Sequence, residues 1–178
     1  ALIVAHKRWG SKNDKYSYIN NAKLILHDLW DKCVLNIIPG QIDSFDKAIT
    51  LSSWFTYAQQ GYKVDVSQVE GVDNAKALHA STWGADYMGV GKNLGDIDLS
   101  VVSGVSLYCK GTDSIKVIVK DVNGKEAMIV KNLWESGWDK VVFSFNDMTS
   151  QRDFDWMHVS SIMLQPEGDT LVLDNVAL

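Results

Sequence analysis

The sequence predicts an all-β protein, a β-sandwich jelly roll over residues 41–178, preceded by a short N-terminal helical hairpin over residues 1–38. Two observations lead to this prediction. The spacing of apolar residues changes near Gln41 from a helical period to a period of two, and strand-like runs then recur about every ten residues between Gly, Asn and Asp turns. A hydrophobic content of 46% in 178 residues is enough to bury a sizeable core.

The helical hairpin is predicted from two apolar runs and the polar segment between them. Residues 18–34 place apolar side chains at the i, i+3, i+4, i+7 spacing of an amphipathic helix, and residues 1–9 carry a shorter apolar run. Polar residues 10–15 supply a turn, and Pro39-Gly40 stops the second helix. The chain begins at Ala1 rather than at Met, within a predicted helix, so we expect it to be a fragment of a longer protein.

The sandwich is predicted from ten strand-like runs. They are residues 41–46, 62–68, 75–82, 86–94, 101–109, 115–120, 126–133, 139–145, 158–165 and 170–177. The clearest hairpin joins Ile115–Lys120 to Glu126–Val130, because Asn123-Gly124 between them is a strong turn signal. Asp121 suits this turn better than it suits a ligand contact.

Composition and charge argue against several classes of function. A net charge of -5, with Lys and Arg scattered singly, offers no binding surface for nucleic acid or for an anionic membrane and favours a neutral partner. No apolar run approaches the length of a membrane span, and no signal peptide is visible. Cys33 and Cys109 form neither a metal box nor a redox motif, and a single disulfide and two free thiols both remain open. The histidines have no zinc spacing.

Aromatic residues point instead to sugar binding. The chain has seven Trp and six Tyr residues, and a flat aromatic ring beside polar groups matches a pyranose, which has an apolar C–H face as well as hydroxyls. We assign Trp54 and Trp138 to the core. Trp83, Trp134 and Trp156 lie at strand edges or in loops next to polar residues, where each either contacts a sugar or caps the core.

Five motifs between residues 42 and 176 keep the order seen in one kind of module. They are Ile42-Asp43-Ser44-Phe45-Asp46, Trp54-Phe55-Thr56-Tyr57, Tyr87-Met88-Gly89-Val90, the run 137–145 that begins Gly137-Trp138-Asp139, and Leu173-Asp174-Asn175-Val176. In this order they resemble the β-jelly-roll carbohydrate-binding modules of families 11 and 30. Residues 1–9 resemble the tail of the signature helix of family 8 glycoside hydrolases. The two resemblances imply that residues 1–38 are the remnant of an adjacent catalytic domain and that residues 41–178 are its binding module.

The resemblance also assigns ligand-binding residues. It implies that Tyr57 and Tyr87 stack on successive sugar rings and that Arg152 hydrogen-bonds sugar hydroxyls with its planar fork. Gln165 stands where the family often has an aromatic residue. With Trp83, Trp134 and Trp156 added as candidates, these residues make up the expected ligand-binding set.

A structural Ca²⁺ is implied by the same resemblance. Modules of this kind commonly hold calcium between the first and the last strand, where oxygen atoms of Asp43 or Asp46 would meet Asp174. The family usually has Glu at the position of Asp46, and the shorter Asp either alters the coordination geometry or leaves the site empty. Alternatively, the three aspartates cap turns.

The function implied is non-catalytic binding of soluble β-glucan chains, with β-1,4 or mixed β-1,3-1,4 linkages. The module would target an appended glycoside hydrolase to plant polysaccharide and would be secreted and extracellular, with no nucleic acid or membrane partner. We expect no hydrolysis from this chain, because the acidic residues of the family 8 signature would lie before Ala1. The alternative is a structural or protein-interaction jelly roll without a sugar ligand. A small hydrolase would require two acids facing each other across a cleft.

Overall fold

The computed structural model describes residues 40–46, 53–133 and 137–178. The chain divides into two units, Ala1–Ile38 and Pro39–Leu178, and the described residues belong to the second. The helical hairpin expected over residues 1–38, together with Cys33 and Trp134, therefore lies outside the described residues.

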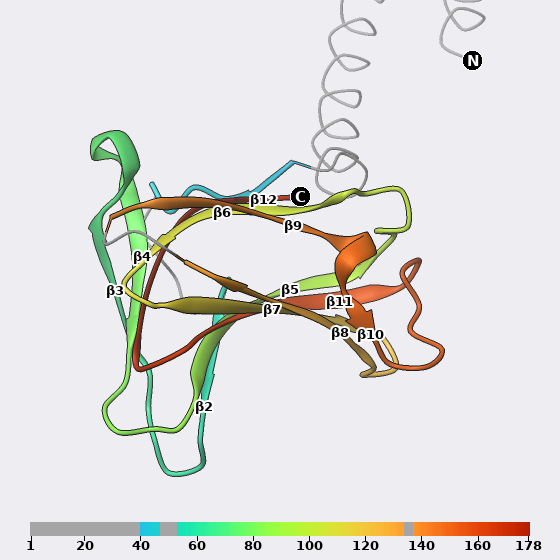
Figure 1. Cartoon of the computed structure of the whole chain (residues 1–178), viewed down its shortest axis with the longest axis horizontal. Helices are drawn as coiled ribbons and strands as arrows, with labels where there is room; N and C mark the ends of the chain where they lie inside the picture. Colours follow the sequence, from blue (N-terminus) through green and yellow to red (C-terminus); the bar gives the residue numbers. More distant parts are fainter. Residues whose placement is uncertain (1–39, 47–52, 134–136) are drawn as a thin grey trace, which may run out of the picture. The chain divides into compact units, whose positions relative to one another are not determined.

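Twelve strands and two short 3-10 helices make up the described part (Figure 1). The strands are β1 (Gln41–Asp43), β2 (Phe55–Ala58), β3 (Asp65–Glu70), β4 (Lys76–Ser81), β5 (Met88–Ile97), β6 (Gly104–Lys110), β7 (Ser114–Asp121), β8 (Glu126–Asn132), β9 (Asp139–Ser144), β10 (Thr149–Ser150), β11 (Val159–Pro166) and β12 (Thr170–Ala177). The 3-10 helices are η1 (Val72–Asn74) and η2 (Phe145–Asp147). Neither of these helices has the length that crossing a membrane requires.

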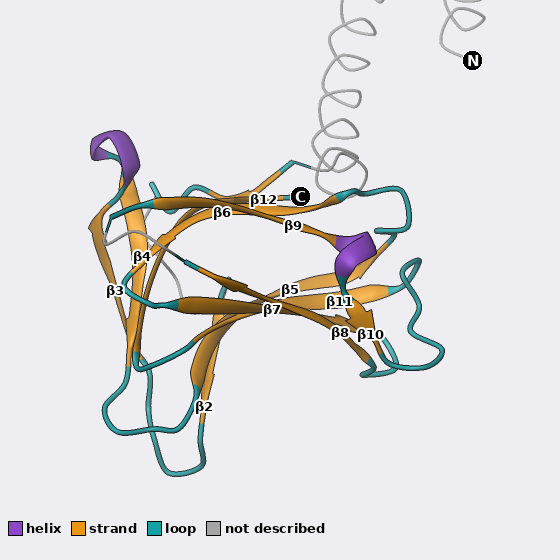
Figure 2. Ribbon diagram, in the orientation of Figure 1, coloured by secondary structure: helices purple, strands orange, loops and turns teal. Residues whose placement is uncertain are grey.

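The strands form two antiparallel sheets that pack face to face (Figure 2). The first sheet has the order β3-β4-β12-β6-β9, and β1 also pairs with β12. The second sheet has the order β10-β8-β7-β11-β5-β2. Neighbours in each sheet are mostly distant in sequence, which is how a jelly roll is connected. The predicted all-β sandwich is confirmed.

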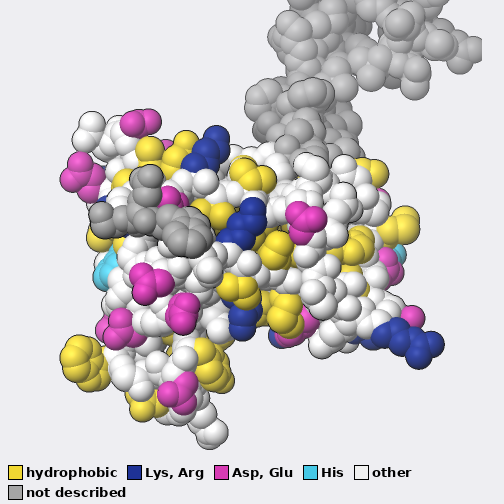
Figure 3. Space-filling view, in the orientation of Figure 1, with side chains coloured by type: hydrophobic (Ala, Val, Ile, Leu, Met, Phe, Trp, Pro, Cys, Tyr) yellow, Lys and Arg dark blue, Asp and Glu magenta, His cyan; other side chains and the backbone are white. Residues whose placement is uncertain are grey.

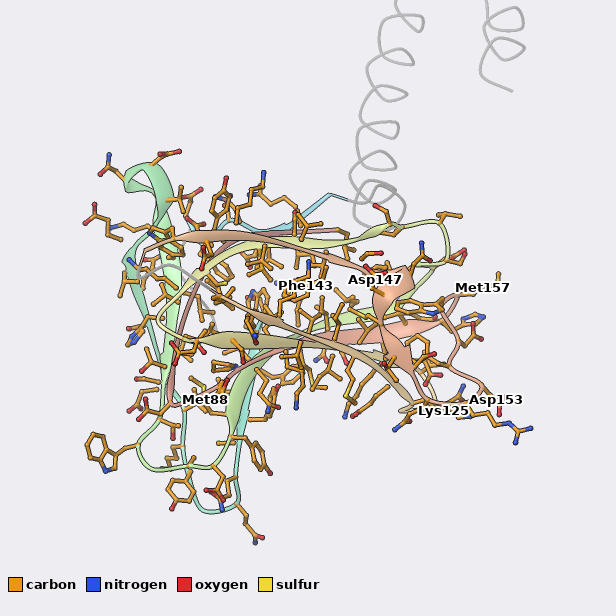
Figure 4. All side chains as sticks on the ribbon, viewed as in Figure 1. Met88, Lys125, Phe143, Asp147, Asp153 and Met157 are labelled. Carbon is orange, nitrogen blue, oxygen red and sulfur yellow. The ribbon has the colours of Figure 1, made fainter. Side chains whose placement is uncertain are left out.

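The core lies between the two sheets and is built by alternation along each strand. On β7, Val117 and Val119 are fully buried between the sheets, whereas Lys116 and Lys120 point the other way. Phe143 of β9 reaches the same core from the first sheet (Figure 4). Burying one side chain of this size stabilises a fold by about 1.5–3 kcal/mol.

The expected hairpin joins β7 to β8, with Lys120 opposite Glu126. Gly124 adopts a positive φ of 79° in the turn. The Oδ1 atom of Asp121 accepts hydrogen bonds from the backbone N–H groups of Asn123 (2.8 Å) and Lys125 (2.9 Å). The structure therefore places Asp121 in the turn, as its position in the sequence predicted.

The first strand is shorter than the predicted run 41–46 for a local reason. Phe45 has a positive φ of 58°, and its N–H donates to Asp43 Oδ1 at 2.9 Å, so that β1 ends at Asp43. Two strands had not been predicted. The four residues of β2 and the two polar residues of β10 are too short to show a period in the sequence.

Of the two tryptophans assigned to the core, Trp54 is buried there, with 2% of its surface exposed. The assignment of Trp138 was wrong. Asp139 pairs with Cys109, and Val141 and Phe143 face the core, so the even-numbered position 138 lies on the outer side of the first sheet. The ammonium of Lys110 lies 4.5 Å from the centre of the Trp138 ring.

Cys109 is a free, fully buried thiol. Burial, with a contribution from the charge of Asp139, raises its pKa to about 12. A thiol with so high a pKa is unreactive at neutral pH.

Candidate functional site

The outer face of the second sheet presents a cross-strand row of mainly apolar side chains. Consecutive register pairs connect Phe55 of β2, Gly91 of β5, Met163 of β11, Ile118 of β7 and Met128 of β8. Only 7% of Met163 and 8% of Ile118 is exposed, although neither belongs to the core between the sheets. Neighbouring side chains on the outer face therefore cover them, and we call these five residues the apolar row.

Two aromatic rings lie flat on this face because the residues opposite them are glycines. A Cβ atom added to Gly91 would fall on the ring of Phe55, and one added to Gly89 would fall on the ring of Tyr57. The two rings are neighbours, with centroids 6.4 Å apart and planes inclined by 43°. One face of each ring thus rests on β5, which makes Phe55 and Tyr57 an aromatic platform at one side of the apolar row.

The hydroxyl of Tyr57 is buried and has no hydrogen-bond partner among the described residues. Burial raises the pKa of this phenol well above its usual range, and the negative charge of Glu126 adds to the shift. The hydroxyl therefore stays protonated at neutral pH. A buried donor without a partner costs about 1–3 kcal/mol.

Polar residues form a second cross-strand row beside the apolar row. Asn93 pairs with Ser161, Ser161 with Lys120, and Lys120 with Glu126. The Lys120 ammonium and the Glu126 carboxylate form an ion pair of 2.9 Å. This row offers amide, hydroxyl and charged groups along one border of the apolar surface.

A hollow of about 240 Å³ lies where β7 begins and β11 ends. Its lining comprises Asp86, Ser114, Lys116, Val130, Gln165, Pro166, Glu167 and Gly168. Ser114 Oγ donates to Glu167 Oε2 at 2.9 Å. No carboxylate of the described ranges lies within ion-pair distance of Lys116, so its ammonium is available to a ligand. The hollow therefore holds both donors and acceptors.

The structure brings three of the predicted ligand-binding residues together. Tyr57 belongs to the aromatic platform, and Gln165 lines the hollow. Tyr87, which is 43% exposed, directly precedes β5, and its carbonyl accepts a hydrogen bond from Gln59 N–H at 3.1 Å. By the alternation along β5, Tyr87 lies on the same side as Gly89 and Gly91, at the margin of the face.

The other predicted residues lie elsewhere. Trp83 is 89% exposed in the loop between β4 and β5. Arg152 is 95% exposed at the opposite end of the sheet, where its carbonyl accepts a hydrogen bond from Lys125 Nζ at 2.8 Å, and Figure 4 shows Lys125 and Asp153 far from Met88. Trp156 packs against Phe145, with ring centroids 4.9 Å apart, and covers the core.

Sequence analysis did not identify Phe55, Met163 or Asp86 as site residues. One signal in the sequence could have found Phe55. The aromatic residues Phe55 and Tyr57 are two positions apart, and so are the glycines Gly89 and Gly91 later in the chain. Because side chains two apart share a face, such a pair of glycines makes room for such a pair of rings once the strands are adjacent.

The three aspartates expected to hold calcium differ in what surrounds them. Asp43 is already engaged, because its Oδ2 accepts a hydrogen bond from Trp54 Nε1 at 2.8 Å and lies 3.4 Å from the ammonium of Lys92. Asp46 Oδ1 accepts a hydrogen bond from the backbone N–H of Lys76 at 3.2 Å. No three His, Cys, Asp or Glu side chains gather as metal ligands in the described part of the chain.

Asp174 is fully buried, and it fits a cation best. Its Oδ2 accepts a hydrogen bond from the backbone N–H of Val72 at 2.9 Å, whereas its Oδ1 has no partner among the described residues. Burial raises the pKa of this carboxyl, and the charges of Asp46 and Asp73 raise it further, against the lowering effect of hydrogen bonds from Val72 and Asn175. A buried, unpaired carboxylate oxygen near two other acids is a group that a cation would stabilise.

Comparison with known proteins identifies relatives of the fold. No model of a known protein family matches the sequence, and no characterised protein sequence matches it. Among solved structures, the chain is similar to a family 11 carbohydrate-binding module of a cellulosomal cellulase of Clostridium thermocellum, with a TM-score of 0.64 and 21% identity over 80% of this chain and 94% of that one.

Two further structures are similar to the chain. A family 11 module from Clostridium thermocellum in complex with a β-1,3-1,4-mixed-linked tetrasaccharide has a TM-score of 0.63 and 21% identity, over 79% of this chain and 96% of that one. A family 30 carbohydrate-binding module has a TM-score of 0.60 and 15% identity, over 80% of this chain and 99% of that one. The fold resemblance stated from the sequence is confirmed.

Proposed function

We propose that this chain is a non-catalytic carbohydrate-binding module that binds soluble β-glucan chains, with β-1,4 or mixed β-1,3-1,4 linkages, on the outer face of its second sheet. The aromatic platform of Phe55 and Tyr57 is the observation that carries the proposal. Two rings supported from beneath by glycines are held in place before any ligand arrives, so little conformational entropy is lost when a sugar stacks on them.

In the proposed mechanism, one sugar ring stacks on the open face of Tyr57 and the next contacts Phe55 and the apolar row. Gln165 and Lys116 in the hollow bind hydroxyl groups of a neighbouring sugar. Each of these bonds replaces a bond to water, so its net contribution is about 0.5–1.5 kcal/mol. The affinity should therefore be modest.

The similarity to modules that bind sugars supports the wider proposal, which is that the chain is secreted and targets an appended glycoside hydrolase to plant polysaccharide. One similar structure contains a mixed-linked tetrasaccharide, and another is part of a cellulosomal cellulase. We also propose that a structural Ca²⁺ binds at Asp174 and Asp46, where it would neutralise the unpaired Oδ1 of Asp174. Asp43 is left out because its partner is the Lys92 ammonium.

A second candidate function is protein contact through the same face. The apolar row ends in Met163, Ile118 and Met128 rather than in further aromatics, and the ion pair of Lys120 with Glu126 borders it. An apolar surface with a charged border is also typical of protein interaction sites.

Affinity electrophoresis distinguishes the two functions. The chain would be run through native gels that contain mixed-linkage β-glucan, xyloglucan, xylan or no polymer, beside the variants Tyr57→Ala and Tyr108→Ala. Tyr108 is the matched control, because it lies on the first sheet, with the Lys140 ammonium 5.6 Å from its ring centre. We expect a glucan gel to retard the wild type and Tyr108→Ala but not Tyr57→Ala. Equal mobility of the wild type in every gel would favour protein contact.

A further inference from the structure

The end of the sandwich next to the hollow is held together by hydrogen bonds between loops. Residues 59–64 connect β2 to β3, and residues 82–87 connect β4 to β5. Gln59 Nε2 donates to Asp86 Oδ2 and Asp86 N–H donates to Gln59 Oε1, both at 2.9 Å. Thr82 Oγ1 donates to the carbonyl of Lys63 at 2.8 Å, and Thr82 N–H donates to the carbonyl of Asp169 in the turn before β12 at 2.9 Å. Three connections are thus fixed relative to one another.

This braced end exposes two aromatic side chains, Tyr62 and Trp83. Tyr62 is 43% exposed, and its ring lies next to Gly84, where an added Cβ would be 3.9 Å from Cε1. Trp83 is 89% exposed, the largest fraction that any large hydrophobic side chain shows in the described ranges. In Figure 3, hydrophobic side chains project at the lower left, where the end of β2 and the loop before β5 lie. We call Tyr62 and Trp83 the loop-end pair.

Because Trp83 is almost wholly exposed, nearly the whole face of its indole ring is available to a ligand that has an apolar face. A flexible tail could fold its aromatic residues away, but the loop that carries Trp83 is fixed on both sides by Thr82 and Asp86. The backbone that carries the ring is therefore held in place. Such preorganisation favours binding of a ligand that has an apolar face.

The loop-end pair is continuous with the outer face of the second sheet. Asp86 lines the hollow together with Lys116 and Gln165, and Tyr87 stands at the margin of the face. Tyr87 lies four positions before Gly91, which corresponds to about 13 Å at the rise of a strand. Trp83 lies four positions before Tyr87, beyond Met88, which is the last residue of β5 that pairs with β2.

We propose that the loop-end pair is a further sugar-binding subsite, which a glucan chain reaches only when it is long enough to extend from the aromatic platform across the hollow and beyond the end of the sheet. A short oligosaccharide would occupy the outer face alone. The module would thus bind polymeric β-glucan more tightly than it binds a tetrasaccharide of the same linkage, and Trp83 would account for the difference. This inference rests on the proposed function.

The test measures the affinity of four proteins for two ligands by isothermal titration calorimetry. The ligands are polymeric mixed-linkage β-glucan and a mixed-linked tetrasaccharide, and the proteins are the wild type, Trp83→Ala, Tyr57→Ala and Val101→Ala. Val101 is the matched control, because it is 85% exposed in a loop that joins β5 to β6. Since Trp83 makes little contact with the fold, Trp83→Ala should unfold at the wild-type temperature.

We expect Trp83→Ala to weaken polymer binding about two- to tenfold, the effect of one stacking contact, and to leave tetrasaccharide binding unchanged. Tyr57→Ala should weaken binding of both ligands, and Val101→Ala of neither. If Trp83→Ala binds the polymer as tightly as the wild type does, the subsite is wrong and the proposed function stands. The same conclusion holds if Trp83→Ala loses affinity equally for both ligands. A wild type that binds neither ligand would overturn the proposed function and the subsite together.

Discussion

The ring of Tyr57 rests on Gly89, its register partner on the neighbouring strand, so closely that a Cβ atom on Gly89 would occupy the position of the phenol end of the ring. Phe55 has the same relationship to Gly91. Two glycines that would weaken an ordinary strand here make room for two neighbouring aromatic rings on the sheet. This arrangement connects the fold to the proposed function, and single substitutions at Gly89 and Tyr57 test it.

Gly89→Ala should lift the Tyr57 ring from the sheet. The added methyl group also approaches the carbonyl oxygen of Leu164 at 2.7 Å, so we expect a loss of about 1–3 kcal/mol in the free energy of unfolding, as for other overpacked sites. Glucan affinity should fall, because the ring no longer rests on its support. Urea unfolding and affinity electrophoresis would measure the two effects. Gly137→Ala is the control, since a Cβ there meets nothing within 4 Å, and equal stability of both variants would contradict the prediction.

Tyr57→Phe should leave the free protein as stable as the wild type or stabilise it by about 1 kcal/mol. The substitution keeps the ring and removes a buried hydroxyl that has no partner among the described residues. Because the hydroxyl is buried and the ring is kept, the same variant should bind glucan as tightly as the wild type. Thermal unfolding and titration calorimetry separate these effects. A clearly less stable Tyr57→Phe would show that the hydroxyl has a partner in the free protein.

Asp121→Asn should make stability less dependent on acidic pH. Burial raises the pKa of the Asp121 carboxyl, but hydrogen bonds from the backbone N–H groups of Lys125, Asp155 and Asn123 outweigh burial, so the pKa in the folded state is lowered. Because the pKa is lower in the folded state, the ionised carboxylate stabilises the fold at every pH above the pKa of the unfolded state, which is near 3.9. This stabilisation is lost as the pH falls through the pKa of the folded state.

Urea unfolding of Asp121→Asn between neutral pH and pH 2 measures this dependence. The variant should be less stable than the wild type at pH 7, and the difference should shrink in acid. Asp153→Asn is a suitable control, because the Asp153 side chain is 75% exposed and pairs with Lys125 and Arg152. A constant difference at every pH would contradict the assignment.

Calcium should raise the unfolding temperature of the wild type, and Asp174→Asn should abolish that increase. The raised pKa of Asp174 shows that its charge is unfavourable where it lies, so in the absence of calcium the neutral amide should cost little stability at pH 7. Differential scanning fluorimetry with calcium and with a chelator would measure both effects. Asp43→Asn tests the specificity of the site, because it removes the partner of Lys92 and should leave the response to calcium intact. An unfolding temperature independent of calcium in the wild type would exclude the site.

Much of the fold follows from local pattern. Strand β12 covers the predicted residues 170–177, a short and mainly apolar run that follows the Gly-containing turn at residues 167–169. The turn at Asn123-Gly124 was predictable because a glycine tolerates the positive φ that the hairpin needs. Tyr57, Tyr87 and Gln165 were singled out by resemblance, and the structure places all three on or beside one face. Trp156 was singled out equally and covers the core.

The sequence by itself determined the β-sandwich and its longer strands, because a period of two and turn residues are properties of neighbouring positions. Only the tertiary structure decided which residues meet. Phe55 and Gly91, or Met163 and Ile118, are far apart in the chain and become neighbours through strand pairing that no local pattern encodes. The same holds for Trp138, whose side of the sheet was fixed by the pairing of Asp139 with Cys109. The outer face of the second sheet, which joins residues from five strands, is a property of register, and register is set by the packing of the whole sandwich.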